Sequence, residues 1–83
     1  MISFEKRAFD EYRQWEKTDK MIFGKINNLL TEIMRDPFCG TGKPEPLKWD
    51  KSGYWSRRIT EEHRLVYKIK NDQVIIASCK SHY

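Results

Sequence analysis

Hydrophobic positions in the first third of the chain recur with the period of a helix. One set falls at steps of four, four and three along the sequence and therefore shares one helix face: Phe4, Ala8, Tyr12 and Trp15. Thr18-Asp19 then supplies residues that favour a helix N-cap, so we expect the first helix to stop near Lys17 and a second to begin there.

A second apolar stripe has the same period and predicts the buried face of the second helix: Ile22, Ile26, Leu29, Leu30 and Ile33. Pro37 should end this helix, because the residue before a proline avoids the helical region. Two amphipathic helices with a turn-length gap predict a helical hairpin. Ile2-Ser3-Phe4 precedes the hairpin as a short apolar start that fits an edge strand.

Residues 37–53 differ from the rest because proline and glycine interrupt them repeatedly. The interrupting residues are Pro37, Gly40, Gly42, Pro44, Pro46 and Gly53. This composition predicts a loop. Seventeen residues make a long connection for so small a protein, and loops of this length are often functional.

The remaining chain reads as three strands, at 53–60, 63–70 and 74–79. The short gaps between them, at 61–62 and 71–73, suit hairpins and predict an antiparallel meander.

Alternation along these strands separates two faces. The apolar face, which should meet the helices, carries Trp55, Ile59, Leu65, Tyr67 and Ile69. The opposite face carries Ser56, Arg58, Arg64 and Lys68. In the register that joins the two apolar faces, Arg58 and Arg64 become near neighbours. Like charges placed opposite each other destabilise a sheet, so such a pair suggests a site that holds an anion.

The predicted fold class is therefore α+β, with two helices on one face of a small antiparallel sheet and the other face bare and basic. With 83 residues the chain is expected to form one domain, residues 1–83. Its longest apolar run is Val74-Ile75-Ile76-Ala77, whereas a membrane-spanning helix needs about 20 apolar residues. The first twenty residues are charged throughout and lack the apolar core of a secretory signal, so we expect a cytoplasmic protein with no membrane partner.

The net charge of +4 is confined to one part of the chain. Residues 1–42 contain seven basic and seven acidic side chains, and all of the excess lies in 43–70. That segment also contains Trp49, Tyr54, Trp55 and Tyr67, and cations interleaved with aromatic rings suit phosphate contact and base stacking. A solvated strand face in a lysine-rich protein is the alternative interpretation.

The cysteines and histidines do not form a metal-binding pattern. Cys39 and Cys79 lie 40 residues apart without a CxxC motif, and His63 and His82 are isolated. We therefore expect no metal and no cofactor. Cys79 lies in an apolar stretch and is expected in the core, whereas Cys39 is expected to be exposed, with both thiols reduced.

Nucleotide-binding loops and a nucleophile elbow are also missing from the sequence. What it offers instead is a loop carboxylate, Glu45, held between two prolines, a histidine near the end, His82, and cations at Lys48, Arg58 and Arg64. A base, an acid and two or three cations suffice to cleave RNA without a metal.

Each of these residues also has a simpler interpretation. Glu45 fits an ordinary loop carboxylate, and His82 fits a frayed terminal side chain. Arg58 and Arg64 could pair with the acidic residues of the hairpin turn, Glu61 and Glu62. The residues alone therefore lead to a small basic α+β domain that is either an RNA binder or a nuclease.

A longer pattern resembles one family. It comprises GKPEPLK at 42–48, SGYWSRRITEEHRLVY at 52–67 and the terminal His82-Tyr83. This pattern closely resembles the YoeB toxins of the RelE/ParE superfamily, with a looser match through the helices, so that it covers essentially the whole chain. Only the N-terminal strand and first helix, Cys39 and Trp49 depart from the family pattern.

The resemblance implies a fold, an activity and roles for six residues. YoeB toxins are ribosome-dependent endoribonucleases that cut mRNA in the ribosomal A site without a metal, on a RelE-like β-α-α-β-β-β fold. The family's general base falls on Glu45, its general acid on His82 and its transition-state arginine on Arg64. Its phosphate contacts fall on Lys48 and Arg58, and its terminal aromatic residue on Tyr83.

The resemblance also implies partners: the ribosome with its rRNA and mRNA, a YefM-like antitoxin whose acidic tail covers the site, operator DNA through the antitoxin complex only, and a second copy in a homodimer. Two other functions stay open at this point. A ParE-type inhibitor of DNA gyrase would share the fold without the catalytic set, and a plain RNA-binding module would bind RNA without cutting it.

Overall fold

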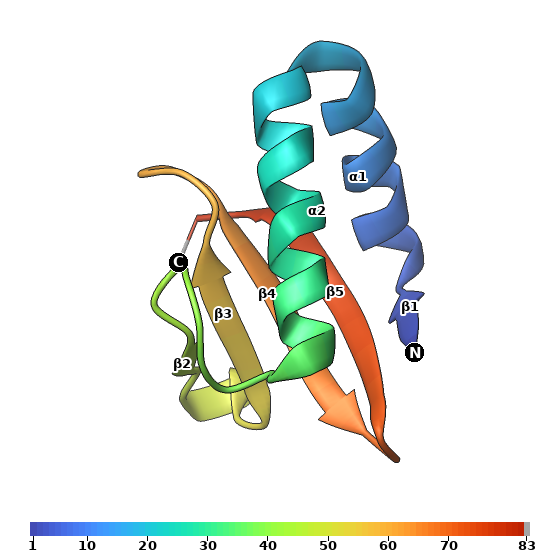
Figure 1. Ribbon diagram of the computed structural model, residues 1–83. Helices are drawn as coiled ribbons and strands as arrows, with labels where there is room; N and C mark the ends of the chain where they lie inside the picture. The colour runs from blue at the N-terminus through green and yellow to red at the C-terminus, as the bar shows by residue number, and fades with distance from the viewer. Residues whose placement is uncertain (83) are drawn as a thin grey trace.

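The computed structural model, which describes residues 1–82, contains two helices and a five-stranded sheet (Figure 1). In chain order the elements are β1 (Ile2–Phe4), α1 (Lys6–Thr18), α2 (Lys20–Arg35), β2 (Glu45–Pro46), a 3₁₀ turn (Trp49–Lys51), β3 (Tyr54–Arg58), β4 (Arg64–Lys70) and β5 (Gln73–Ser81). The predicted α+β class is confirmed. No helix in the described part of the chain is both long and apolar enough to cross a membrane.

The strands follow the order β1-β5-β4-β3-β2 across the sheet. The meander β3-β4-β5 is antiparallel as predicted. Two details differ from the prediction. β1 runs parallel to β5, with Ile2 opposite Val74, so the sheet is mixed, and Glu45–Pro46 of the predicted loop forms the short strand β2 against β3. Both pairings join distant segments, which local patterns do not specify.

The helical hairpin turns at the predicted residue. The carboxylate of Asp19 accepts hydrogen bonds from the backbone N–H groups of Met21 and Ile22, each at 3.1 Å. These are two of the N–H groups that a helix start leaves without a partner, so Asp19 is the N-cap of α2. α2 ends at Arg35, ahead of Pro37.

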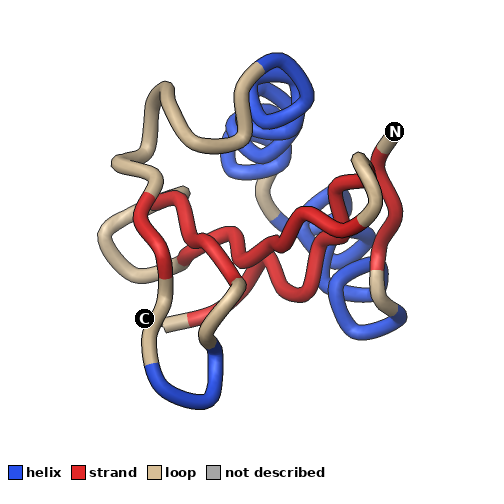
Figure 2. Tube along the Cα trace, turned by 90° about the horizontal axis from the view of Figure 1, so that it is seen from below, coloured by secondary structure: helices blue, strands red, loops and turns tan. Residues whose placement is uncertain are grey.

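Both helices share one core with the strands. Its buried members are Ala8, Trp15, Ile26, Leu29, Leu30, Ile33, Ile59, Leu65, Tyr67, Val74, Ile76 and Cys79. All nine positions of the two predicted helical stripes are in this set or packed against it. Figure 2 looks along the helices and shows the strands as one twisted band beside them.

α1 completes the edge of β5 where the short β1 ends. The Glu11 carboxylate accepts a hydrogen bond from the backbone N–H of Cys79 at 2.9 Å. The Trp15 indole N–H donates to the carbonyl oxygen of the same residue at 2.8 Å. A strand edge with unpaired polar groups invites unwanted pairing, and here side chains from α1 satisfy both groups of Cys79.

The sheet face opposite the helices is less bare than predicted. Ser56, Val66 and Ser81 are buried, although alternation places Ser56 and Val66 beside the charged residues Arg58, Arg64 and Lys68. Val66 and Ser81 line a small cavity on this face together with the larger side chains of Lys51 and Tyr54.

Candidate functional site

Charged residues on three strands of the open face, Glu45, Arg58 and Arg64, form a row that ends at Ser81 on a fourth strand. Glu45 on β2 lies opposite Ser56 on β3. Arg58 at the end of β3 lies opposite Arg64 on β4, and Arg64 in turn lies opposite Ser81 on β5. The predicted juxtaposition of Arg58 and Arg64 is therefore confirmed by the register of the first hairpin.

Glu45 and Arg64 form the centre of this row. The Arg64 guanidinium donates from Nη1 to Glu45 Oε1 at 3.0 Å and lies 3.5 Å from Ser56 Oγ. The Glu45 side chain is 58% exposed and that of Arg64 is 16% exposed. A solvent-exposed carboxylate beside a largely buried guanidinium can accept a proton from a bound molecule, while the guanidinium stabilises the negative charge of that molecule.

The backbone around Glu45 limits where its carboxylate can lie. Pro44 and Pro46 flank it and fix their own φ angles. The pairing of β2 with β3 then holds Glu45 against the sheet, and the Leu47 N–H donates to the carbonyl oxygen of Tyr54 at 2.8 Å. The Glu45 carboxylate is therefore carried by a conformationally restricted edge strand and not by a flexible loop.

Arg58 and Lys48 supply further positive charge. Among the described residues the Arg58 guanidinium has no hydrogen-bond partner, and Lys48 is exposed. With Glu45 balancing only one of two adjacent guanidinium groups, the row keeps an excess of positive charge. That excess suits a phosphate, which arginine can bind through two parallel N–H groups.

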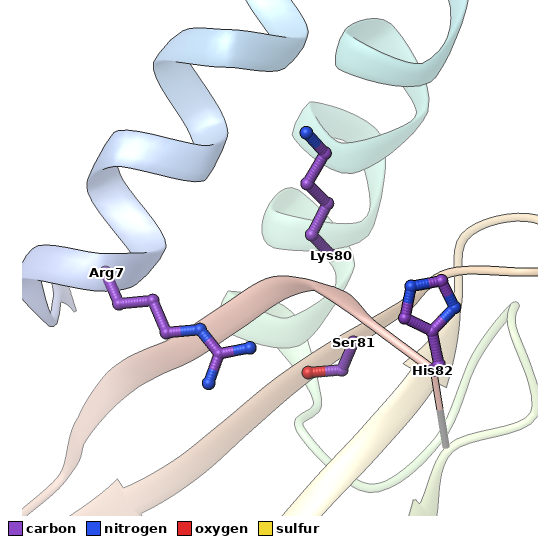
Figure 3. Close-up of a pocket in the computed structure, with 4 residues that line it drawn as sticks. All are labelled: Arg7, Lys80, Ser81 and His82. Carbon is purple, nitrogen blue, oxygen red and sulfur yellow. The ribbon is translucent and has the colours of Figure 1, made fainter.

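His82 follows Ser81, the residue opposite Arg64, but its ring does not lie beside Glu45 and Arg64. β5 extends to Ser81, two residues beyond the prediction, and His82 follows directly. Lys80 and His82 project to one side of the ribbon and Ser81 to the other (Figure 3). The His82 ring rests on His63, with ring centroids 4.9 Å apart. Within residues 1–82 no hydrogen bond or ion pair joins His82 to Glu45 or Arg64.

His63 links this terminal ring to the core. Its ring centroid is 5.0 Å from that of Trp15, and its backbone N–H donates to Thr60 Oγ1 at 3.0 Å. Its Nδ1 atom is buried and has no hydrogen-bond partner among residues 1–82. Tyr83, which the resemblance also placed in the site, lies outside the described residues.

The sequence-based interpretation gave no role to Arg57, which is buried on the helix side of β3 with 0% exposure. Its guanidinium donates to the hydroxyl of Tyr67, the carboxylate of Glu32 and three loop carbonyl groups. These contacts are Nε to Tyr67 Oη at 3.1 Å, Nη1 to Glu32 Oε1 and Thr41 O at 3.3 Å each, and Nη2 to Asp36 O at 2.9 Å and Cys39 O at 2.7 Å. Arg57 thereby ties the loop after α2 to the sheet that carries the row.

Burial around Arg57 also changes the acid–base properties of its neighbours. Burial raises the pKa of the Tyr67 hydroxyl, and the hydrogen bond from Arg57 partly opposes the rise.

The burial of Arg57 could have been predicted from the sequence, because alternation puts residue 57 between Trp55 and Ile59 on the core face.

The two cysteines lie as predicted. Cys79 is fully buried and Cys39 is exposed. Burial raises the pKa of the Cys79 thiol to about 12, so the thiolate needed for nucleophilic attack is scarce at neutral pH. In the described part of the chain, no three His, Cys, Asp or Glu side chains come together as a metal site would require.

Together, the hairpin on a mixed sheet and the row of Glu45, Arg58 and Arg64 define a small α+β domain with a candidate site for anions. The family model of the "YoeB-like toxin of bacterial type II toxin-antitoxin system" matches residues 4–83. The chain therefore belongs to the YoeB-like toxins of bacterial type II toxin–antitoxin systems.

Individual relatives agree along the whole length. The chain is 54% identical to Toxin YoeB of Escherichia coli strain K12, over 99% of this chain and 98% of the relative. Among solved structures, a YoeB–YefM complex from Staphylococcus aureus superposes with a TM-score of 0.92 at 46% identity, covering 100% of this chain and 97% of the other. A YoeB dimer from the same organism gives 0.91 at 48% identity, covering 99% and 95%.

Proposed function

We propose that this toxin is a ribosome-dependent endoribonuclease that cuts mRNA in the ribosomal A site without a metal. The observation that carries the proposal is the contact of 3.0 Å between Glu45 and Arg64, with Arg58 opposite Arg64 in the same row. It combines a carboxylate that can take a proton with two cations that can hold a phosphate. The family resemblance supports the same roles.

The reaction would begin at the ribose 2′-hydroxyl. Glu45 takes the proton, the 2′-oxygen attacks the adjacent phosphorus, and the bond to the 5′-oxygen of the next nucleotide breaks. His82 gives its proton to that departing oxygen, which leaves a 2′,3′-cyclic phosphate and a 5′-hydroxyl. General acid–base help of this kind contributes about 10²–10⁴-fold to the rate.

The cations would act on the charge that builds up at phosphorus. Arg64 stabilises the pentavalent phosphorane, and Arg58 and Lys48 contact the phosphate oxygens. The His82 ring rests on His63, so acid catalysis by His82 requires the ring to leave His63 and move to the phosphate held by Arg64. Tyr83 is assigned to orienting the substrate on the resemblance alone.

We also propose a YefM-like antitoxin and a second copy of the toxin as partners. The Staphylococcus aureus relatives are described as a YoeB–YefM complex and as a YoeB dimer. The excess positive charge of the row suits an acidic antitoxin tail that covers it. Contact with operator DNA would then pass through the antitoxin.

The proposal is tested by primer extension on a defined mRNA, with and without ribosomes, comparing the natural chain with His82→Ala and Glu45→Gln. We expect one cut within the A-site codon, only with ribosomes, that is lost in both variants. Circular dichroism would confirm that the variants are folded. No cut from the folded natural chain would overturn the proposal, and a DNA supercoiling assay would then test gyrase inhibition.

A further inference from the structure

Two neighbouring cavities lie at the β5 end of the cationic row. The first, of about 230 Å³, is lined by Arg7, Lys80, Ser81 and His82 (Figure 3). The second, of about 100 Å³, extends along the open face and is lined by Glu5, Arg7, Lys51, Tyr54, Val66, Ala77, Ser78 and Ser81. Arg7 and Ser81 line both cavities, so the Arg7 side chain borders each of them.

The Arg7 guanidinium is held in place by a chain of contacts to β5. Its Nε donates to Glu11 Oε2 at 3.0 Å. The other carboxylate oxygen of Glu11 accepts from Ser78 Oγ at 3.0 Å and from the Cys79 N–H at 2.9 Å. Glu11 is therefore fixed to the strand and aims Arg7 across it, as Figure 3 shows for the side chain beside Ser81.

Part of the guanidinium stays available for a ligand. The Arg7 side chain is 68% exposed, and its two Nη groups make no hydrogen bond with the described residues. Two parallel N–H groups in a fixed plane match two oxygens of one phosphate. The site thus fits a phosphodiester group that lies over the end of β5.

The proposed chemistry says which phosphate this would be. Glu45, on β2, acts on the 2′-hydroxyl of the nucleotide on the 5′ side of the cut. His82, directly after β5, acts on the 5′-oxygen of the nucleotide on the 3′ side. The RNA therefore crosses the sheet from β2 toward β5, and its 3′ continuation passes the strand end where Arg7 stands.

We propose that Arg7 binds the phosphate that follows the first nucleotide on the 3′ side of the cut. This inference rests on the proposed endoribonuclease function and adds a substrate subsite to it. Arg7 would raise the affinity for mRNA that continues past that nucleotide and would leave the chemistry at the scissile phosphate to Glu45, Arg64 and His82.

The test compares two mRNAs bound to ribosomes, one ending with a 3′-hydroxyl on the first nucleotide after the cut and one continuing for several nucleotides. Arg7→Gln should lower kcat/KM about tenfold on the longer mRNA, as expected for a lost hydrogen bond to a charged group, and should leave the shorter one within about twofold. Lys6→Gln is the matched control, because Lys6 is adjacent, carries the same charge, is 90% exposed and pairs with Asp10. Lys6→Gln should leave kcat/KM unchanged on both mRNAs.

Three results would overturn the inference, each for a different reason. Equal losses on both mRNAs would mean that Arg7 contacts the ribosome instead of this phosphate. No loss on either would mean that it contacts neither. Failure of the folded natural chain to cut both mRNAs would show that the proposed function is wrong and would remove the basis of the inference. Thermal unfolding of each variant separates these results from misfolding.

Discussion

Arg57 and Arg58 are adjacent in β3, and the strand turns them to opposite faces of the sheet. Arg57 points to the helices, is fully buried and has its guanidinium saturated by five acceptor atoms. Arg58 points to the open face beside Arg64 and makes no side-chain hydrogen bond to the described residues. Two arginines that are adjacent in the sequence thus have opposite environments, one buried and saturated with acceptors and one on the open face.

The difference shows how to recognise an arginine that is available for a substrate. Burying a charge is costly unless every donor finds a partner, and the loop carbonyl groups meet that condition for Arg57. An arginine left with donors free beside another cation is instead poised to bind an anion. Burial and hydrogen-bond saturation therefore distinguish a structural arginine from one available to a substrate, whereas amino-acid composition does not.

The largest expected effect is on Arg57. Arg57→Met should lower the free energy of unfolding by about 3 kcal/mol, because the Tyr67 hydroxyl and the loop carbonyl groups lose their buried donor and a buried polar group left without a partner costs about 1–3 kcal/mol. Arg58→Met is the matched control. It removes the same charge one residue away and should change stability by about 0.5 kcal/mol or less, while cleavage falls.

Urea denaturation of the two variants measures this contrast directly. If both variants lost the same stability, the distinction between a structural and a substrate-facing arginine would be wrong for this sheet. The contrast would also fail if Arg57→Met unfolded at the natural midpoint, because the five contacts would then contribute nothing to folding.

A smaller effect is expected from changing the shape of a cation without its charge. Arg64→Lys should lower the cleavage rate on ribosomes about tenfold or more, because one ammonium cannot bridge Glu45 and a phosphate as a planar fork does. Stability should hardly change, since the pair with Glu45 is partly exposed. Arg13→Lys, on α1, where the ion pair with Glu16 at 3.8 Å is exposed, is the control. Equal rates for Arg64→Lys and the natural chain would show that Arg64 acts as a point charge.

Local chemistry in the sequence was enough for much of the fold. The helical stripes and the Asp19 cap placed the hairpin, and alternation plus short gaps placed the meander. The same alternation predicts that Arg58 and Arg64 lie side by side, and the register of β3 and β4 confirms it. These features depend on residues close in sequence, whose geometry a period and a turn largely determine.

Other features depend on contacts between distant segments. The parallel partner of β1 and the short strand β2 required knowing which edge of the sheet was free. The position of His82 against His63 depends on where β5 ends. The cavities beside Arg7 could not be predicted, because no local pattern indicates that α1 lies across the end of β5. The roles of Glu45, Arg64 and His82 rest on family resemblance and remain predictions.

The smallest expected effect concerns the outer end of the Arg57 network, where Thr41 donates two hydrogen bonds to Glu32. These bonds, from its N–H at 2.8 Å and its hydroxyl at 2.7 Å, are the main reason that the pKa of Glu32 is lowered, with Arg57 adding to the effect. A carboxyl group with a lower pKa in the folded state stabilises the fold above its unfolded pKa, and this contribution is lost as the pH falls through the folded-state pKa.

Glu32→Gln should therefore lower Tm at pH 7, by less than Arg57→Met does, and the gap from the natural chain should narrow well below about pH 4.3, the ordinary pKa of a glutamate. Glu16→Gln, which removes an exposed carboxylate on α1, should show a smaller gap at pH 7. Thermal scans at pH 7 and in the acidic range measure both variants. A gap for Glu32→Gln that stays constant with pH would mean that ionisation of Glu32 does not stabilise the fold, so that neither the hydrogen bonds from Thr41 nor the charge of Arg57 favours the carboxylate over the neutral acid.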